Sequence, residues 1–386
     1  MADLAANINK LSFKLMNNKT DKYRLPFGSL WKMKIEHPYS LLVQEAGFAW
    51  TCGQCPLDEN GQVAHENDLV AQTHHVVQSI RTILSRAELQ SPIVGKLVVY
   101  YVEQSAECVQ QMLAILQHEF GSSAIIQPIA VPYFYYSGML VEIDVHAAES
   151  RHFVRSTVID KAGLNIHVTD FDQLVWVNVI AEAGEQFNQA MRAEQLVKAL
   201  AAFDLGADEL LADHWFTSPE LAQPVLDAFA ANGLVTDLGA VAITRLPQNT
   251  ALVGELTFAK RSGSQRNSVS SARRIGDLTL TLRKKGDFFW AGVRMGNCTM
   301  TLPEQTRKAM IALNNVMLSH GLSFDRVCKV TTHYVGDNTP ADLHDNMTVR
   351  NSYYAQPGPA STGLPVDALM DPQSLISIDV LGRCSR

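Results

Sequence analysis

Several residues of this chain have types and spacings that could support chemistry. The most compact motif is Cys52-Gly53-Gln54-Cys55, a C-x-x-C pattern found in thiol redox centres and as half of a zinc site. No helix is predicted directly after the motif, and no second C-x-x-C is present to complete a zinc site. We therefore expect neither a redox centre nor a bound metal at these cysteines.

Polar side chains in or beside two predicted strands are the next candidates. Glu142 lies within the apolar run 139–145, and Ser361-Thr362 follows the turn-forming residues 358–360. Because neighbouring residues of a strand face opposite sides, the Glu142 carboxylate either points inward as a general base or outward into solvent. Ser361 and Thr362 could direct hydroxyl groups at a ligand, but a nucleophilic serine needs a neighbouring base that the sequence does not identify.

Histidines and aromatic residues form two further groups. His74 and His75 are adjacent on a predicted helix, where their directions differ by about 100°. We therefore interpret them, together with His65, as surface or packing residues and not as metal ligands. The aromatic run 133–136 could roof an apolar ligand pocket or cover an interface between domains, and we favour the interface.

Hydrophobic periodicity defines the elements that must position these residues. Helices are predicted at about 69–86, 106–120, 185–203, 219–231, 304–319 and 342–354. Strands are predicted at about 31–35, 40–44, 48–52, 96–102, 124–131, 139–145, 165–169, 174–180, 240–244, 252–258, 278–282, 288–293, 326–335 and 375–381. Helices that alternate with strands joined by short turns predict an α+β fold, with the helices on one face of each mixed sheet.

A helix, a loop and a strand recur three times at a nearly constant spacing. Leu89, Leu205 and Leu322 occupy matching points of the repeats and are 116 and 117 residues apart. This period has the size of a small domain. The predicted segments are an N-terminal arm over 1–28, a first domain over 29–148, a degenerate second domain over 149–260, a linker over 261–276 and a third domain over 277–386.

Composition narrows the class of protein. The net charge is −7 and the pI is about 5.9, so nothing in the overall charge favours nucleic acid as a partner. No window has the roughly 20 apolar residues of a membrane-spanning helix, and residues 1–21 lack the apolar segment of a signal peptide. We expect a soluble, cytoplasmic protein that binds a small molecule, with its six dispersed cysteines reduced.

Short motifs in the first and third domains resemble the RidA/YjgF family. In the first domain they are His37-Pro38-Tyr39-Ser40, Thr51-Cys52-Gly53-Gln54, Ala71-Gln72-Thr73 and Leu140-Val141-Glu142-Ile143-Asp144. In the third domain they are Glu304-Gln305-Thr306, residues 325–331 and residues 357–363. The second domain is identified by its place in the repeat and by Arg245-Leu246-Pro247.

This resemblance implies a chorismate-mutase-like fold, in which two helices back a sheet, and trimers with a ligand cleft between neighbouring subunits. Three such domains in one chain then form a covalent pseudo-trimer, which we expect to be a monomer or a homodimer. The resemblance implies no cofactor. One cleft can keep a chemical role while the other clefts become structural.

Catalytic members of the family hydrolyse reactive enamines and imines to ketones and ammonia, and an arginine binds the substrate carboxylate. The position of this arginine falls on about Gln127, Leu238 and Ser361 in the three domains, and none of these residues is basic. Gln127 could instead bond a neutral amide or carbonyl group. Tyr39 matches a tyrosine that lines the family's cleft, and simple packing is the alternative for this residue.

The family also uses a glutamate to handle water. Its position matches Glu142 in the first domain and Glu255 in the second, whereas the third domain has Ser377. Because the family's arginine is missing, Arg294 and Arg350 of the third domain are candidates for a displaced carboxylate clamp. The alternative for both arginines is a solvated position on the surface.

These residues favour a RidA-like hydrolase or deaminase that acts on a small nitrogen-containing metabolite in one cleft between domains. A non-catalytic protein that binds a small molecule is the first alternative, because the family's arginine is missing. A chorismatase-like hydrolase is the second alternative, since such enzymes elaborate the same fold, and Ser377 at the glutamate position argues against it.

Overall fold

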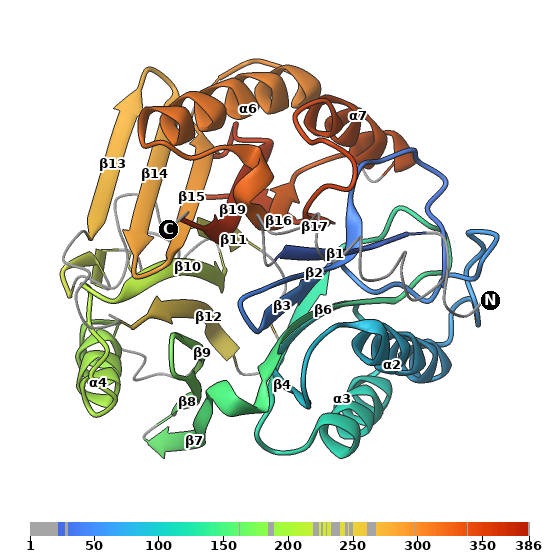
Figure 1. Ribbon diagram of the computed structural model, residues 1–386, viewed down its shortest axis with the longest axis horizontal. Helices are drawn as coiled ribbons and strands as arrows, with labels where there is room; N and C mark the ends of the chain where they lie inside the picture. The colour runs from blue at the N-terminus through green and yellow to red at the C-terminus, as the bar shows by residue number, and fades with distance from the viewer. Residues whose placement is uncertain are drawn as a thin grey trace, which may run out of the picture.

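A computed structural model of the chain contains three β-sheets that lie toward the middle of the molecule, with helices on the outside (Figure 1). The structure describes residues 22–384 apart from 28–29, 162, 184–188, 219–223, 225–226, 229, 233–239, 244–245, 247–249, 261–267, 297 and 338. Each sheet is antiparallel except where one strand runs parallel to its neighbour. The predicted α+β architecture of three tandem chorismate-mutase-like domains is confirmed.

The first unit is a six-stranded sheet backed by two helices. Its elements are β1 (Lys22–Pro26), β2 (Ser40–Glu45), β3 (Phe48–Thr51), α2 (Leu69–Arg86), β4 (Pro92–Val102), α3 (Ala106–Phe120), β5 (Ile125–Val131) and β6 (Val141–Glu149). The strand order is β1-β2-β3-β6-β4-β5. The helix α2 begins where the Asp68 side chain accepts a hydrogen bond from the Ala71 amide, and its apolar stripe packs on β6.

The second unit is a seven-stranded sheet, and one of its strands comes from the C-terminal part of the chain. Its elements are β7 (Phe153–Lys161), β8 (Leu164–Phe171), β9 (Leu174–Glu182), α4 (Gln189–Ala201), β10 (Leu210–Thr217), β11 (Ala240–Ile243) and β12 (Thr250–Ala259). That strand is β18 (Ala368–Leu369), which pairs antiparallel with β11. The predicted helix at 219–231 lies largely outside the described residues.

The third unit repeats the strand order of the first. Its elements are β13 (Val269–Ile275), β14 (Leu278–Lys285), β15 (Phe288–Met295), α6 (Leu302–Ser319), β16 (Val327–Tyr334), α7 (Pro340–Asn351), β17 (Ala360–Pro365) and β19 (Ile376–Arg383). The order β13-β14-β15-β19-β16-β17 places β17 at the edge, parallel to β16. Both α6 and α7 start with a capping box and a proline in the first turn.

Three segments differ from the prediction. Residues 22–26 of the predicted arm form β1, which pairs with β2, and residues 31–35 are not a strand. Residues 269–275, predicted as part of a linker, form β13 and pair residue for residue with β14. The Ser- and Arg-rich composition of this segment suits an exposed edge strand as well as a linker, because its side chains need no apolar partner.

One apolar cluster joins the three units. Trp50, Trp176 and Trp290 lie on β3, β9 and β15, are at most 2% exposed, and belong to the same cluster. Pairs of strands from different sheets also contact one another, namely β5 with β8 and β9, β10 with β14 and β15, and β17 with β2 and β3. Each sheet therefore packs against the other two, and residues from two units can meet in each interface.

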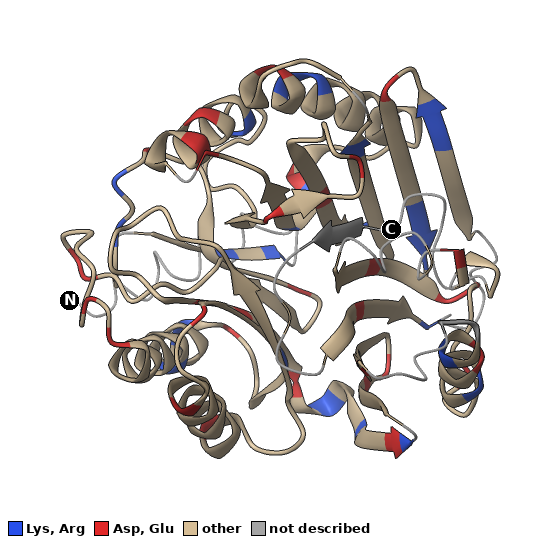
Figure 2. Ribbon diagram, turned by 180° about the vertical axis from the view of Figure 1, so that it is seen from behind, with Lys and Arg blue, Asp and Glu red and all other residues tan. Residues whose placement is uncertain are grey.

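Charged residues of both signs are interspersed along the outer helices, and basic residues also occur on the hairpin of β13 and β14 (Figure 2). Among the described residues, no helix is both long and apolar enough to cross a membrane. The expectation that nucleic acid is not a partner stays a prediction.

Candidate functional site

A cavity of about 50 Å³ lies between the first and third units. Four residues predicted as site residues line it: Tyr39 just before β2, Glu142 on β6, Arg350 on α7 and Ser361 on β17. Most of the other lining side chains are apolar or aromatic. The cavity thus brings together a possible acid or base, a cation and two hydroxyl groups from elements far apart in the sequence.

Arg350 is the cation of this cavity. Its side chain is 1% exposed, its Nε donates to Asn346 Oδ1 at 3.0 Å, and its Nη1 lies 3.5 Å from Ser361 Oγ. No carboxylate within the described residues forms an ion pair with it. A buried charge without a counter-charge is unfavourable, so a guanidinium retained at a cavity wall is well suited to bind an anionic ligand. Of the two predicted clamp arginines, Arg350 has this geometry.

Glu142 is the acid of the cavity. Burial raises the pKa of its carboxyl group, the nearby Asp144 charge raises it further, and Lys329 lowers it, leaving a pKa of about 8. The carboxyl group is therefore mostly protonated at neutral pH and can donate a proton. Of the two predicted orientations, the inward one is correct, since Glu142 lines the cavity.

The Glu142 carboxyl group occupies space that is free because Gly53 has no side chain. A Cβ atom built on Gly53 would lie 1.6 Å from Glu142 Oε1. Gly53→Ala is therefore expected to displace the carboxyl group and to lower the turnover of any substrate that depends on it by about tenfold or more. The control is Gly206→Ala, whose added methyl group would meet only Glu209 Oε2 at 3.5 Å. Equal activity of the two variants in a steady-state assay would contradict this role.

The C-x-x-C motif contributes to the same cavity wall. Cys52 and Cys55 are both buried free thiols that line the cavity. Burial raises the pKa of both thiols well above the ordinary value, so they stay protonated and are poor nucleophiles. Within the described residues, no group of three His, Cys, Asp or Glu side chains is arranged to hold a metal ion.

The β-bulges of the three sheets fix which residues are equivalent. The register of β4, β10 and β16 shifts just before Lys96, Ala212 and Lys329, respectively. The residues four positions after Lys96, Ala212 and Lys329 pair across the sheet with Glu142, Val253 and Ser377, respectively. Two residues along, the partners are Asp144, Glu255 and Asp379. The predicted equivalence of Glu255 with Glu142 is therefore wrong by two residues, and only the first unit has a carboxylate at the Glu142 position.

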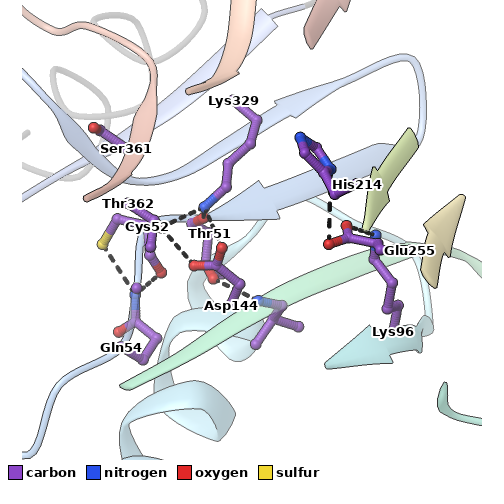
Figure 3. A network of polar contacts seen from close by, with 12 residues as sticks. Thr51, Cys52, Gln54, Lys96, Asp144, His214, Glu255, Lys329, Ser361 and Thr362 are labelled. Atoms are coloured by element: carbon purple, nitrogen blue, oxygen red, sulfur yellow. Dashed lines mark hydrogen bonds and ion pairs between the residues drawn. The ribbon is translucent and has the colours of Figure 1, made fainter. Parts of the chain in front are cut away.

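Glu255 instead belongs to an ion pair between units. Its Oε1 lies 2.5 Å from Lys96 Nζ, so the second unit is tied to the first. The equivalent pair, Lys329 Nζ to Asp144 Oδ2 at 2.8 Å, ties the third unit to the first, and the Thr362 hydroxyl bridges its two members (Figure 3). These charges compensate each other, so Glu255 and Thr362 have structural partners and do not line the cavity.

The third interface uses different cations because Ala212 replaces the lysine. Asp379 pairs with Arg294 Nη2 at 2.8 Å and with His214 Nε2 at 3.1 Å. The predicted clamp role of Arg294 therefore has no support in its position, since its charge is compensated and it lies away from the cavity. At the position equivalent to Asp144, each of the three interfaces therefore has an acid that pairs with a cation from a neighbouring unit.

Gln127 and Ser361, both predicted at the family's arginine position, do not lie at equivalent points of their strands. On β5 and β17, register pairs Gln127 with Val98 and Thr362 with Thr331, so Gln127 is equivalent to Thr362 and not to Ser361. Consistent with this, Ser361 points away from the Lys329–Asp144 pair in Figure 3. Gln127 is fully buried outside the cavity, and its amide has no partner within the described residues. Leu238 lies outside the described residues.

Ionisation of His214 should make stability depend on pH. Burial lowers the pKa of this imidazole, but the charges of Asp379 and Glu255 and the hydrogen bond to Asp379 outweigh burial and Arg294 and raise it overall. The stabilisation is thus full below the ordinary pKa of about 6.5 and is lost as pH rises through the raised pKa. We expect the difference in unfolding free energy between wild type and His214→Gln to shrink above pH 6.5. Chemical denaturation measures it.

The control for this prediction is His344→Gln, since His344 is exposed. It should show no such pH-dependent difference from wild type. A His214→Gln difference that is constant or grows with pH would contradict the charged state of His214.

Sequence reasoning missed five residues of the interfaces as ion-pair partners, namely Lys96, Asp144, His214, Lys329 and Asp379. The signal for them was the pattern of lysine, alanine and lysine at the three bulge positions. Where Ala212 replaces the lysine, the acid that this lysine would pair with, Asp379, must pair with another cation. The sequence alone does not identify which cation that is, because Arg294 comes from another strand of the sheet.

The match to a known protein family falls on the first unit of the chain. Residues 31–149 match the family model described as Endoribonuclease L-PSP. Over 50 residues the chain is 42% identical to the 3-aminoacrylate deaminase RutC of Acinetobacter baylyi, which is 13% of this chain and 40% of the relative. The alignment thus spans well under half of that relative's length.

Solved structures with similar folds include a chorismatase with 14% identity and a TM-score of 0.48, covering 75% of this chain and 93% of the chorismatase chain. A Rid family protein of Yersinia pestis, YyfA, has 23% identity and a TM-score of 0.29, covering 33% of this chain and 98% of its own. The family-model match thus falls on the first unit, the part of the chain that contains motifs resembling the RidA/YjgF family.

Proposed function

We propose that this chain is a hydrolase that deaminates a small carboxylate-bearing imine or enamine in the cavity between its first and third units. The observation that carries the proposal is Arg350, a buried guanidinium without a carboxylate partner in the described chain, in one cavity with the protonated acid Glu142. The family match and the named activity of the deaminase relative support the same reaction class.

The substrate would bind with its carboxylate on the Arg350 guanidinium and the Ser361 hydroxyl, in place of the family's arginine. A bidentate bond between guanidinium and carboxylate fixes both the position and the plane of the anion. The reacting carbon and nitrogen would then lie toward Glu142, which packs on Gly53. Arg350 therefore replaces the family's strand arginine from a different element, the helix α7.

Proton transfer would fall to Glu142. Its neutral carboxyl group protonates the enamine carbon, which converts the enamine to an iminium ion. The resulting carboxylate accepts a proton from the water that attacks the iminium carbon. Transfer of that proton to nitrogen makes ammonia the leaving group. As the C–N bond breaks, the Glu142 carboxylate takes the remaining hydroxyl proton, which leaves the 2-oxo acid and restores the neutral carboxyl group.

The other two clefts lack this acid. At the positions equivalent to Glu142 they have Val253 and Ser377, neither of which transfers protons near neutral pH. We therefore assign chemistry to a single cleft and a structural role to the other two. This assignment also accounts for the fusion of three domains, because only a fused chain lets its three interfaces diverge.

The test is hydrolysis of freshly generated 2-aminoacrylate, followed as ammonia and pyruvate against the spontaneous rate. The proposal predicts acceleration by the wild-type chain, which Glu255→Gln keeps and Glu142→Gln loses. A chain that accelerates nothing but binds pyruvate at Arg350 would support the alternative of a non-catalytic binding protein.

A further inference from the structure

The loop 132–140 separates the cavity from a second hollow. This groove has a volume of about 330 Å³ and is lined by the loop, by Val102 at the end of β4 and by Thr339 and Pro340 at the start of α7. Phe134, Tyr135, Tyr136 and Met139 line both hollows. The aromatic run therefore lies at the interface of the first and third units, as predicted, and also forms the wall between the cavity and the groove.

The cavity alone is small. A closed cavity of about 150 Å³ accommodates benzene, so one of about 50 Å³ holds only the reacting end of a substrate. Among the residues that the structure describes around this cavity, Arg350 and Glu142 are the only basic and acidic side chains. A substrate therefore has one place for an anion and none for a second charge.

The groove has the chemistry of an aromatic subsite. None of its described lining residues is acidic or basic, and four consecutive aromatic residues, 133–136, contribute to it. Two prolines, Pro132 and Pro340, add rigid apolar surface. Aromatic rings bind preferentially to such surfaces, because ring pairs stack or meet edge to face.

Hydrogen bonds anchor both ends of the aromatic run 133–136, which separates the cavity from the groove. The Tyr133 hydroxyl donates to Asp342 Oδ2 at 3.1 Å, and the Lys34 amide donates to the Tyr136 hydroxyl at 2.8 Å. Tyr135 lies between these anchors, is half-buried, and has its ring 4.8 Å from that of Tyr136. The anchored tyrosines fix the loop ends, so a rotation of the Tyr135 side chain is the smallest change that would join cavity and groove.

We propose that the groove binds an aromatic ring of the substrate, whose carboxylate and imine occupy the cavity. The substrate class is then a 2-imino or 2-enamino monocarboxylate with an uncharged aromatic side chain. This inference rests on the proposed function for the reacting end, while the groove makes its own prediction about binding.

The experiment compares phenylpyruvate with pyruvate, the products expected from an aromatic and a short substrate. Calorimetry on the full chain should give at least about tenfold tighter binding of phenylpyruvate, the gain from burying a phenyl group. Val102→Trp, which fills the groove, and Tyr135→Ala, which removes a ring, should each lower this ratio about fivefold or more. Ile311→Trp on the exposed face of α6 is the control and should leave the ratio unchanged.

Equal affinities of the wild-type chain for the two acids would overturn the inference, as would a ratio unchanged in both groove variants. The same ratio is then measured as kcat/KM with the imines generated from phenylalanine and alanine. If neither imine is hydrolysed while the binding ratio holds, the proposed function fails and the aromatic subsite stands. If both are hydrolysed at equal kcat/KM, the subsite fails and the proposed function stands.

Discussion

Arg350→Met is expected to weaken binding of 2-oxo and 2-imino carboxylates strongly while the fold stays stable. Removing one partner of a buried charged contact weakens binding by about 2–5 kcal/mol, so the Kd of pyruvate should rise about 30-fold or more. The free energy of unfolding should stay within about 1 kcal/mol of wild type, since only the bonds to Asn346 and Ser361 are lost and an uncompensated buried charge is removed.

The matched control is Arg283→Met. Arg283 is also buried, but its Nη1 lies 2.6 Å from Asp213 Oδ1, so its loss leaves that acid without its ion pair. Breaking such a pair costs about 3–5 kcal/mol. If Arg350→Met destabilised the chain as much as Arg283→Met and bound pyruvate normally, Arg350 would be a structural residue and not a ligand clamp.

Glu142→Gln should lower kcat for imine hydrolysis by about 10²–10⁴-fold with a small change in KM, because it removes the proton donor and keeps the shape of the side chain. In the wild type, activity requires the protonated carboxyl group, so kcat/KM should be constant at neutral pH and fall as pH rises through about 8. Stopped assays across pH 6–10 measure this alkaline limb, the fall of kcat/KM with rising pH.

A second variant tests the cause of that pH dependence. Asp144→Asn removes a negative charge that raises the pKa of Glu142, so the alkaline limb should move to lower pH. An alkaline limb that stays in place, or one that persists in Glu142→Gln, would assign the titration to another group.

The helices were predictable because their signals are local. The bounds predicted for α2 and α3 match the structure at both ends, since apolar residues recur with helical spacing and a capping side chain precedes each helix. The strand β13 was not predictable in this way. Its five central residues are Ser-Ser-Ala-Arg-Arg, and only the pairing partner β14 distinguishes an edge strand from a linker of that composition.

The site was predictable where a motif contains the residue. Tyr39, Glu142 and Ser361 each belong to a motif that resembles the family, and the structure brings them to one cavity. Glu255 was misassigned because the sequence does not show the bulge before Ala212, and this bulge sets which residues of the strands are equivalent.

Arg350 could only be a candidate from sequence. Its importance lies in burial without a counter-charge, which depends on where every acidic side chain of the folded chain lies. Arg294 of the third domain has the same side chain, yet Asp379 neutralises it. The difference between a clamp and a structural cation is therefore a property of tertiary structure.

The most direct test of the single-cleft assignment is a crystal structure of the full chain soaked with pyruvate. The assignment predicts the pyruvate carboxylate within hydrogen-bonding distance of Arg350, with its carbonyl carbon facing Glu142, and no pyruvate beside Val253 or Ser377. Pyruvate bound in either of those clefts, with the cavity at Arg350 empty, would contradict it.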